Sequence, residues 1–290
     1  ILTATIRNGK TFTWDPRVSN PLNNRCTEMA SAPTKSVSTI VSDRDRHFIH
    51  FGTETTVGDN TSQDPMFIRF SDQENFNLYN PTSTNTAGTF RLDTGNTIVT
   101  AVNGKDYVLI LTDQAAYTMQ FVGPPFTFSI RQVGTNCGCI GPHAAVYADG
   151  KVFWMGNSGG FFVFDGTVKL LPSLVEDFVF TTDGDNLGIN YASNQIVFGA
   201  HNSLYNEILW FYPKGTPTTG PSVQIDRTVT QKVRKYTKDD CDLMVGITKD
   251  KGELYIIPIE DIEKMGKSKS LKKLEYYREN WDILLRIIEN

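Results

Sequence analysis

The feature that most constrains this chain is a succession of short runs rich in Val, Ile, Phe, Tyr, Trp and Thr, separated by clusters of Gly, Asn, Asp and Pro. Such runs are typical of β-strands joined by turns, and no window before residue 231 keeps the 3.6-residue period of an amphipathic helix. They pair as predicted hairpins: 2–6 with 11–14, 47–51 with 66–70, 107–111 with 116–121, 152–155 with 161–164, and 196–198 with 207–211. We therefore expect residues 1–230 to be all β.

The hairpins also recur at a spacing that indicates an architecture. First strands are expected to begin at residues 107, 152 and 196, a repeat of about 45 residues, typical of four-stranded propeller blades. The longer interval before residue 107 contains a polar stretch, 53–64, which we assign to a long loop. The prediction is a mainly β, propeller-like array of antiparallel blades, with a β-sandwich as the alternative. The hairpin at 2–14 would belong to a blade that begins before the chain does.

Composition divides the chain near residue 230. Of its 28 basic and 32 acidic residues, 35 lie in residues 1–230 and 25 in residues 231–290, whereas all 18 Phe and all 4 His precede residue 231. Such a step marks a domain boundary, and a segment rich in Pro, Gly and Thr, 214–222, lies just before it. We expect two domains, 1–230 and 231–290, that meet near Thr230 and Gln231.

The overall composition restricts the classes of protein to which this chain can belong. No run approaches 18 apolar residues, so no membrane span is expected, and the first residues lack the pattern of a signal peptide. Four cysteines in a chain of this length do not predict a disulfide framework, which favours a reducing compartment. Because the chain starts at Ile1 without Met, we interpret it as a fragment or a processed product.

A glycine-rich pentapeptide, 156–160 (GNSGG), matches the nucleophile loop of chymotrypsin-like proteases, with Ser158 as the nucleophile. The following Pro of that loop is absent, and neither His47 nor His50 lies in the sequence context of a protease base. Because the pentapeptide separates two paired apolar runs, we interpret it as a hairpin turn, and expect Ser158 to have no imidazole within hydrogen-bond reach.

Two further clusters resemble metal sites. Cys137, Cys139 and His143 provide three soft ligands, but no second pair of ligands at zinc spacing accompanies them, so a turn with reduced thiols is favoured. Four carboxylates are placed around His47 in sequence and would suit a cation, but they lack the spacing of a calcium loop, so a solvated loop is favoured: Asp43, Asp45, Asp59 and Asp64. We assign no catalytic and no metal-binding residue in this domain.

Several longer motifs in residues 1–230 together resemble a structural protein of marine podoviruses and related phages. They are Trp14-Asp15, 42–47 (SDRDRH), 63–74 (QDPMFIRFSDQE), 84–88 (TNTAG), 121–126 (FVGPPF), 153–156 (FWMG) and 162–166 (FVFDG). The resemblance implies a virion component of the short tail or portal-proximal connector, assembled in the bacterial host cytoplasm, a homo-oligomer in the virion in contact with other tail or portal proteins. It implies no cofactor and no catalytic residue.

The last 60 residues predict a different small module. A strand ending at residue 247, a turn at 249–252 and a strand over 253–259 form a hairpin. A helix of about five turns should follow, because apolar residues repeat at steps of three and four: Leu271, Leu274, Tyr277, Trp281, Leu284, Leu285 and Ile288. We expect the hairpin to cover this helix, chiefly with Leu243, Val245, Tyr255 and Ile257.

This module resembles the C-terminal part of PD-(D/E)xK homing endonucleases encoded in group I introns, through Tyr236, Asp240, Asp242, Leu243 and 255–259 (YIIPI). In that family the metal-binding Asp and the (Glu/Gln)-x-Lys pair lie upstream, where this chain has phage-like β sequence; the nearest candidate, 224–226 (QID), has Asp in place of Lys. Weak candidates for DNA contact or for the nuclease fold are Lys232, Arg234, Lys238, Asp240 and Asp242.

The sequence therefore supports two hypotheses. The favoured one is a phage virion structural protein fused to an incomplete, inactive homing-endonuclease fragment, the product of a gene interrupted by a mobile element. The alternative is a metal-dependent DNA endonuclease, using Mg²⁺, that carries an exon-derived N-terminal extension. The structural part is favoured because it is the longer and because the nuclease part lacks its catalytic half.

Limited proteolysis should separate the two domains. Because the Pro/Gly/Thr segment lies at the composition step, we expect the first cuts between residues 213 and 238, with the β domain left intact. Mass spectrometry of the fragments measures this. Equal resistance across the junction, or packing of Trp281 against residues before 200, would show that the two parts fold as one.

Overall fold

The computed structural model describes residues 1–17, 25–182, 187–215, 243–247, 254–264, 274–280 and 282. The chain separates into two compact units, Ile1–Pro213 and Lys214–Asn290. The boundary expected from composition, near Thr230 and Gln231, lies outside the described residues, as does Trp281.

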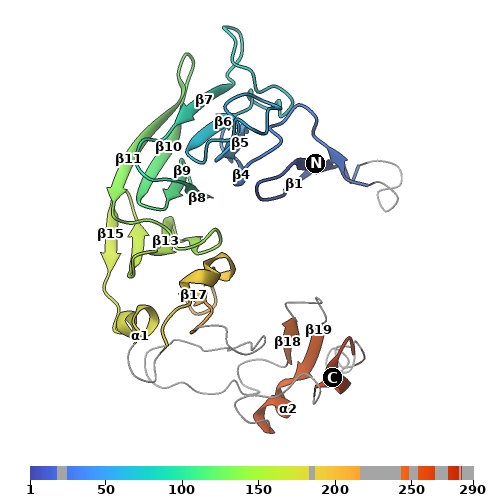
Figure 1. Ribbon diagram of the computed structural model, residues 1–290, viewed down its shortest axis with the longest axis vertical. Coiled ribbons are helices and arrows are strands. Elements are labelled where there is room, and N and C mark those ends of the chain that lie inside the picture. The colour runs from blue at the N-terminus through green and yellow to red at the C-terminus, as the bar shows by residue number, and fades with distance from the viewer. Residues whose placement is uncertain are drawn as a thin grey trace. The chain divides into compact units, whose positions relative to one another are not determined.

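The first unit is a series of antiparallel sheets that follow one another along the chain (Figure 1). A three-stranded sheet comes first, with β1 (Leu2–Thr5), β2 (Thr11–Trp14) and β3 (Thr27–Glu28). Three four-stranded sheets follow, each with its strands in chain order. The first of these contains β4 (Ser38–Val41), β5 (Phe48–Phe51), β6 (Phe67–Phe70) and β7 (Gly88–Arg91). The second contains β8 (Ile98–Asn103), β9 (Val108–Thr112), β10 (Ala115–Gly123) and β11 (Thr127–Thr135). The third contains β12 (Ala145–Ala148), β13 (Lys151–Met155), β14 (Phe161–Phe164) and β15 (Val168–Leu171). The hairpin of β16 (Phe198–Asn202) and β17 (Glu207–Phe211) completes the described part.

The first strands of successive sheets lie side by side. β4 contacts β8, β8 contacts β12, and β12 contacts β16. A parallel bridge between His143 and Phe198 adds to the last of these contacts. This inner row of first strands, with the other strands of each sheet outside it, is the arrangement of propeller blades. The predicted mainly β, propeller-like array of antiparallel blades is confirmed, and a two-sheet sandwich is excluded.

The predicted hairpins are confirmed, but the position of each strand within its blade is corrected. The strands expected to begin the blades at 107 and 152 are the second strands β9 and β13, whereas the one expected at 196 is the first strand β16. The three are therefore not equivalent. The second strands β5 and β9 are buried along their whole length, whereas the inner strands β4 and β12 are only partly buried. Fully buried strands need apolar sequences, so they dominate the sequence pattern.

The apolar run of β9 explains how neighbouring sheets are joined. Val108 and Ile110 belong to the core shared with the β4–β7 sheet, whereas Leu109 and Leu111 belong to the core shared with the β12–β15 sheet. Successive side chains of a strand point to opposite faces, so one strand supplies two cores. A sheet buried on both faces needs this unbroken apolar sequence.

Two short segments correct the expectation of an all-β first unit. Helix α1 (Glu176–Phe180) follows β15 and buries Val179 in the core, and a 3₁₀ turn spans Tyr191–Ile196. The side chain of Asn190 accepts a hydrogen bond from the backbone N–H of Ala192 and so caps this turn. Neither segment is long enough to show a helical period in the sequence.

The second unit contains the predicted hairpin, formed by β18 (Leu243–Ile247) and β19 (Leu254–Pro258). Helix α2 (Ile259–Lys264), which the sequence pattern does not predict, begins directly after β19. Tyr255, Ile256 and Ile259 are buried.

The long helix expected over 271–288 is wrong in its described part. A 3₁₀ turn covers only Glu275–Tyr277, after which Arg278 is extended and pairs with Tyr255. Glu279 then adopts a positive φ of 50°. The backbone of Arg278 cannot both pair with Tyr255 at the edge of the hairpin and continue a helix. The strand contact is the one that forms, although the apolar residues repeat with a helical period. Residues 271–273, 281 and 283–290 of the predicted helix lie outside the described residues.

Replacing Trp154 should destabilise the first unit strongly. Its side chain is 0% exposed, stacks on Phe162 and donates a hydrogen bond of 2.8 Å to the carbonyl of Cys137. We expect Trp154→Ala to lower the free energy of unfolding by about 3–5 kcal/mol, measured by urea denaturation. The matched control is Tyr205→Ala, at a site 64% exposed, with an effect within about 0.5 kcal/mol. Similar losses in both variants would contradict the assigned core.

Candidate functional site

Two histidines lie at the centres of hydrogen-bond networks in the β4–β7 sheet. His47 directly precedes β5 and His50 lies within it, and both are 0% exposed. A buried polar side chain is costly unless its hydrogen bonds are satisfied, so the partners decide what each histidine does.

His47 is held between a carboxylate and a hydroxyl. Its Nδ1 lies 2.6 Å from Asp45 Oδ2 and its Nε2 lies 3.0 Å from Thr86 Oγ1. Ser42 Oγ donates to the same oxygen of Asp45 at 2.8 Å, and the Thr86 hydroxyl donates to Asp72 Oδ1 at 2.7 Å. The result is a continuous chain of hydrogen bonds that joins two carboxylates through one imidazole.

This network corrects the interpretation of the acidic residues near His47. Asp45 is only 5% exposed, so it does not belong to a solvated loop. The other three do not gather around His47. Asp43 accepts from Asn103, Asp59 accepts from Thr61, and Asp64 pairs with Arg91.

His50 has partners of another kind. Its Nδ1 lies 2.8 Å from Ser36 Oγ and its Nε2 lies 3.1 Å from the Tyr79 hydroxyl. Burial lowers the pKa of His50 to about 3, and the positive charge of Arg69 acts in the same direction. Burial also raises the pKa of Tyr79. His50 is therefore a neutral imidazole at physiological pH.

Arg69 and Glu54 fix the loop between β5 and β6, which includes the polar stretch 53–64 that the sequence predicts as a loop. Arg69 is 4% exposed, and its guanidinium donates to the carbonyl of Thr55 at 2.6 Å. The Glu54 carboxylate, which is 0% exposed, accepts from the backbone N–H of Gly58 at 2.7 Å and from Thr34. Burial lowers the pKa of Arg69. These charges stabilise the loop from inside.

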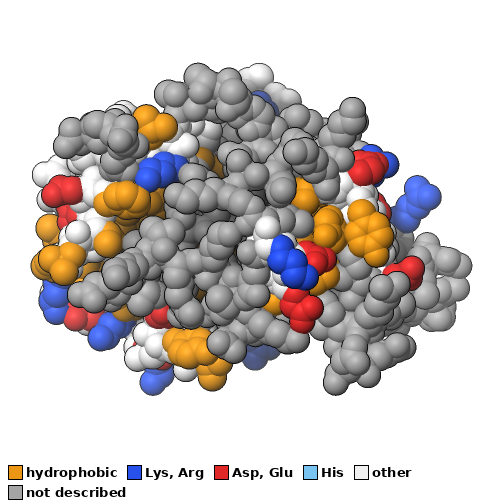
Figure 2. Space-filling view, turned by 90° about the horizontal axis from the view of Figure 1, so that it is seen from below, with side chains coloured by type: hydrophobic (Ala, Val, Ile, Leu, Met, Phe, Trp, Pro, Cys, Tyr) orange, Lys and Arg blue, Asp and Glu red, His pale blue; other side chains and the backbone are white. Residues whose placement is uncertain are grey.

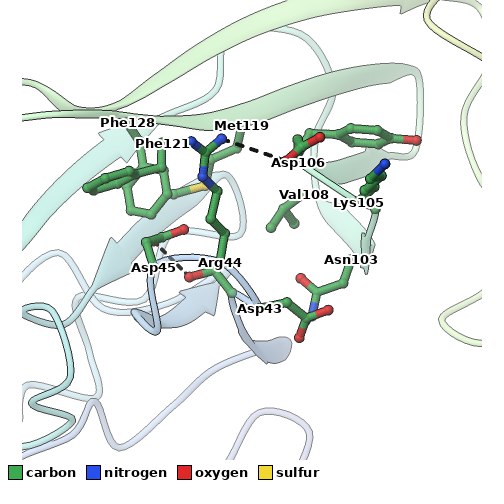
Figure 3. A pocket seen from close by; sticks show the side chains of 13 residues that line it. Asp43, Arg44, Asp45, Asn103, Lys105, Asp106, Val108, Met119, Phe121 and Phe128 are labelled. Carbon is green, nitrogen blue, oxygen red and sulfur yellow. Dashed lines mark hydrogen bonds and ion pairs between the residues drawn. The ribbon is translucent and has the colours of Figure 1, made fainter. Parts of the chain in front are cut away.

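A small cavity lies between the β4–β5 turn and the β8–β9 turn (Figure 3). Arg44 reaches across it to Asp106, at 3.7 Å, while Met119, Phe121 and Phe128 provide apolar walls. Its volume of about 20 Å³ is enough for one water molecule and too small for an organic substrate.

A larger, open groove follows the inner row of first strands. Residues from successive sheets line it, among them Thr5, Thr39, Thr100, Ala145 and Phe198. The described residues that line it include hydroxyls, amides, Arg7 and His143, and no Asp or Glu is among them. These described residues therefore offer hydrogen bonds, but not a carboxylate that could act as an acid, a base or a metal ligand.

Ser158 lies in the β13–β14 turn, as the sequence predicts. It is exposed, and its hydroxyl donates to the side chain of Asn157 at 3.0 Å. All four histidines are described, and none is a hydrogen-bond partner of Ser158. The protease-like pentapeptide is a turn.

The cysteine cluster also separates into unrelated parts. Cys137 and Cys139 are each 1% exposed and belong to the hydrophobic core, whereas His143 is exposed. Burial raises the pKa of the two thiols to about 11 and about 12, so both stay protonated. Gly138 between them is required, because a Cβ there would lie 2.0 Å from the carbonyl oxygen of Asp113.

Within the described ranges, no group of three His, Cys, Asp or Glu side chains is placed to hold a metal ion, and no helix is long and apolar enough to cross a membrane. On the face drawn in Figure 2, the coloured basic side chains are interspersed with acidic and hydrophobic ones. The weak candidates for DNA contact lie outside the described residues: Lys232, Arg234, Lys238, Asp240 and Asp242.

Comparison with known proteins adds a remote structural likeness. No protein-family model and no curated protein matches the chain. Among solved structures, a Synechocystis apocarotenoid oxygenase with one tryptophan replaced by alanine is similar with a TM-score of 0.38 and 12% identity, over 91% of this chain and 68% of that one. The fold assignment rests on the strand pairing described above.

The neutral His50 should make the protein sensitive to acid. Between its ordinary pKa of about 6.5 and its folded pKa of about 3, the unfolded chain binds a proton that the folded chain does not, so stability falls as the pH is lowered through this range. The slope from this one group is at most about 1.4 kcal/mol per pH unit.

His50→Gln keeps hydrogen-bonding groups at this position but does not titrate. We expect its unfolding free energy, measured in urea between pH 7.5 and 4.5, to depend less steeply on pH than that of the wild type. The control is Leu204→Gln, in which the same new side chain replaces a non-titrating one at a site 80% exposed, and which should keep the wild-type slope. Equal slopes in all three proteins would contradict a neutral His50.

Proposed function

We propose that the chain is a virion structural protein of the short tail or the portal-proximal connector of a phage, joined to an incomplete homing-endonuclease fragment. The motifs shared with podovirus structural proteins support the first part of this proposal. The motif around Asp240 and Asp242 supports the second part.

The structural observation that most favours this function is that potentially reactive side chains are buried and serve packing and hydrogen bonding within the fold. The thiols of Cys137 and Cys139 are in the core, and the imidazoles of His47 and His50 have their hydrogen bonds satisfied inside one sheet. Sheets that share cores on both faces also make a stiff body, which suits a component that must transmit load within an assembly. We expect the first unit to contact tail or portal proteins and other copies of this chain, without a cofactor.

Virion association tests the proposal. An antiserum raised against the full chain should detect it in gradient-purified particles of a phage that carries the gene, and immunogold electron microscopy should place it at the tail vertex. The capsid protein and a non-virion phage enzyme serve as positive and negative controls. Detection in infected lysate but not in purified particles would contradict the proposal.

Whether the nuclease-like part cleaves DNA is tested separately. We expect the purified full chain not to nick supercoiled plasmid in the presence of Mg²⁺. Nicking that is abolished by Asp242→Ala and retained in Asp282→Ala would contradict an inactive fragment and favour the endonuclease hypothesis.

A further inference from the structure

The groove along the inner strands contains polar side chains for which the described part of the chain provides no partner. Residues of β1, β4, β8, β12 and β16, and of the turns beside them, line it, and all of them belong to the first unit. Its volume of about 960 Å³ lies within the range of roughly 300–1,000 Å³ that is typical of small-molecule sites. The groove is therefore large enough to hold an organic ligand.

Thr100, on the inner strand β8, has a buried hydroxyl without a partner. The residue is 6% exposed and lines the groove, and its hydroxyl forms no hydrogen bond with the described part of the chain. Every other buried polar side chain of the described ranges has a hydrogen-bond partner. Because a buried polar group without a hydrogen bond costs free energy, the hydroxyl of Thr100 needs water or a ligand in the groove.

The backbone of β8 is irregular directly beside this hydroxyl. Ile98 pairs with Thr112 and Thr100 pairs with Leu111, so the register shifts between the two pairs, as at a β-bulge. Bulges redirect side chains and are frequent next to active sites. The irregularity thus lies where a strand contributes a polar group to the groove.

Arg7 gives the groove a positive charge. It follows β1 and is exposed, and its guanidinium forms no ion pair and no hydrogen bond with the described residues. The exposed imidazole of His143, just before β12, likewise has no partner among them. No Asp or Glu is among the described lining residues, so none of these neutralises Arg7. Since the planar guanidinium fits a carboxylate through two parallel hydrogen bonds, the groove favours an anion.

Arg7 and Thr100 come from strands that are linked through β4. The hydroxyl of Thr39 in β4 donates to the hydroxyl of Thr5 in β1 at 2.9 Å, and β4 contacts β8. Ser38, also in β4, lines the groove with a second hydroxyl that has no partner among the described residues. One ligand can therefore meet the guanidinium and both hydroxyls.

The remaining lining restricts the kind of anion. Hydroxyl groups both donate and accept hydrogen bonds, so they match a ligand that carries hydroxyls of its own. Phe198 adds an aromatic ring that is 46% exposed and suits the apolar face of a ring in the ligand. Nucleic acid fits less well, because it is bound by several Lys or Arg side chains on successive phosphates, and Arg7 is the single Lys or Arg among the described lining residues.

We propose that this groove binds an acidic sugar, with its carboxylate on Arg7 and its hydroxyls on Ser38 and Thr100. A free sugar acid and a unit of an acidic saccharide chain share this chemistry. Such binding would be an activity of the first unit in addition to the virion role, and it does not depend on that role.

Titration of the ¹⁵N-labelled full chain, followed by nuclear magnetic resonance, tests the proposal with glucuronate, trigalacturonate and glucose. We expect the acidic probes to bind with a Kd of about 1 mM or lower and to shift the amide signals of Arg7, Ser38 and Thr100. Glucose lacks the carboxylate and should bind at least about tenfold more weakly. Tighter binding of trigalacturonate would indicate a saccharide chain as the ligand, and tighter binding of glucuronate a free sugar acid.

Two variants separate a binding role from a structural one. Arg7→Gln should weaken binding of the acidic probes by about tenfold or more, and Thr100→Val, which removes only the hydroxyl, by about fivefold. Because that hydroxyl has no partner among the described residues, Thr100→Val should not lower the free energy of unfolding. The control is Arg131→Gln, the same replacement at an exposed site outside the groove, which should keep wild-type affinity.

Three results would overturn the proposal. They are no binding of either acidic probe up to about 10 mM, equal affinity for the acidic probes and glucose, and unchanged affinity in Arg7→Gln. Tighter binding of a single-stranded oligonucleotide that depends on Arg7 would also overturn it and assign the groove to nucleic acid. The comparison of the probes on the wild-type chain decides the proposal even if a variant fails to fold.

Discussion

The first unit depends on the burial of the β8–β11 sheet on both faces. β9 alternates between two cores, with Val108 and Ile110 on one side and Leu109 and Leu111 on the other. Removing apolar surface from water contributes about 25 cal/mol per Å², so a strand with no solvent-facing side adds to both cores at once. Neighbouring sheets are thereby coupled, and the loops and inner strands are held relative to this strand. A polar residue in β9 would disturb one core or the other, whichever position it took.

The β4–β7 sheet is organised in another way, because much of its interior is polar. His47 with Asp45, His50 with Tyr79, and Arg69 are all buried, and each has its hydrogen bonds satisfied by groups from loops rather than from strands. Such networks specify loop positions more strictly than apolar packing does, since an unpaired buried polar group costs free energy. The neutral His50 loses its contribution as the pH falls.

These arrangements bear on the kind of function that suits the first unit. The residue types that usually perform chemistry are present, but Cys137, Cys139, Asp45 and the first two histidines are buried and belong to the framework. The described residues of the groove along the inner strands provide hydroxyls, amides, Arg7 and His143, and no carboxylate is among them. These features support the role in assembly that we propose, in which shape and stiffness matter more than reactivity.

The sequence by itself determined the strands, because a period of two and the turn residues between runs are local properties. The hairpins that include β5, β9, β13 and β19 were predictable for this reason, and so was the turn at Ser158. Only the tertiary structure decided which strand is innermost, since that depends on burial by neighbouring sheets. It also decided that Arg278 pairs with Tyr255 instead of continuing a helix, and that Asp45 is buried beside His47. Thr86 lies 39 residues from His47, so no local pattern could have brought them together; the packing of the sheet did.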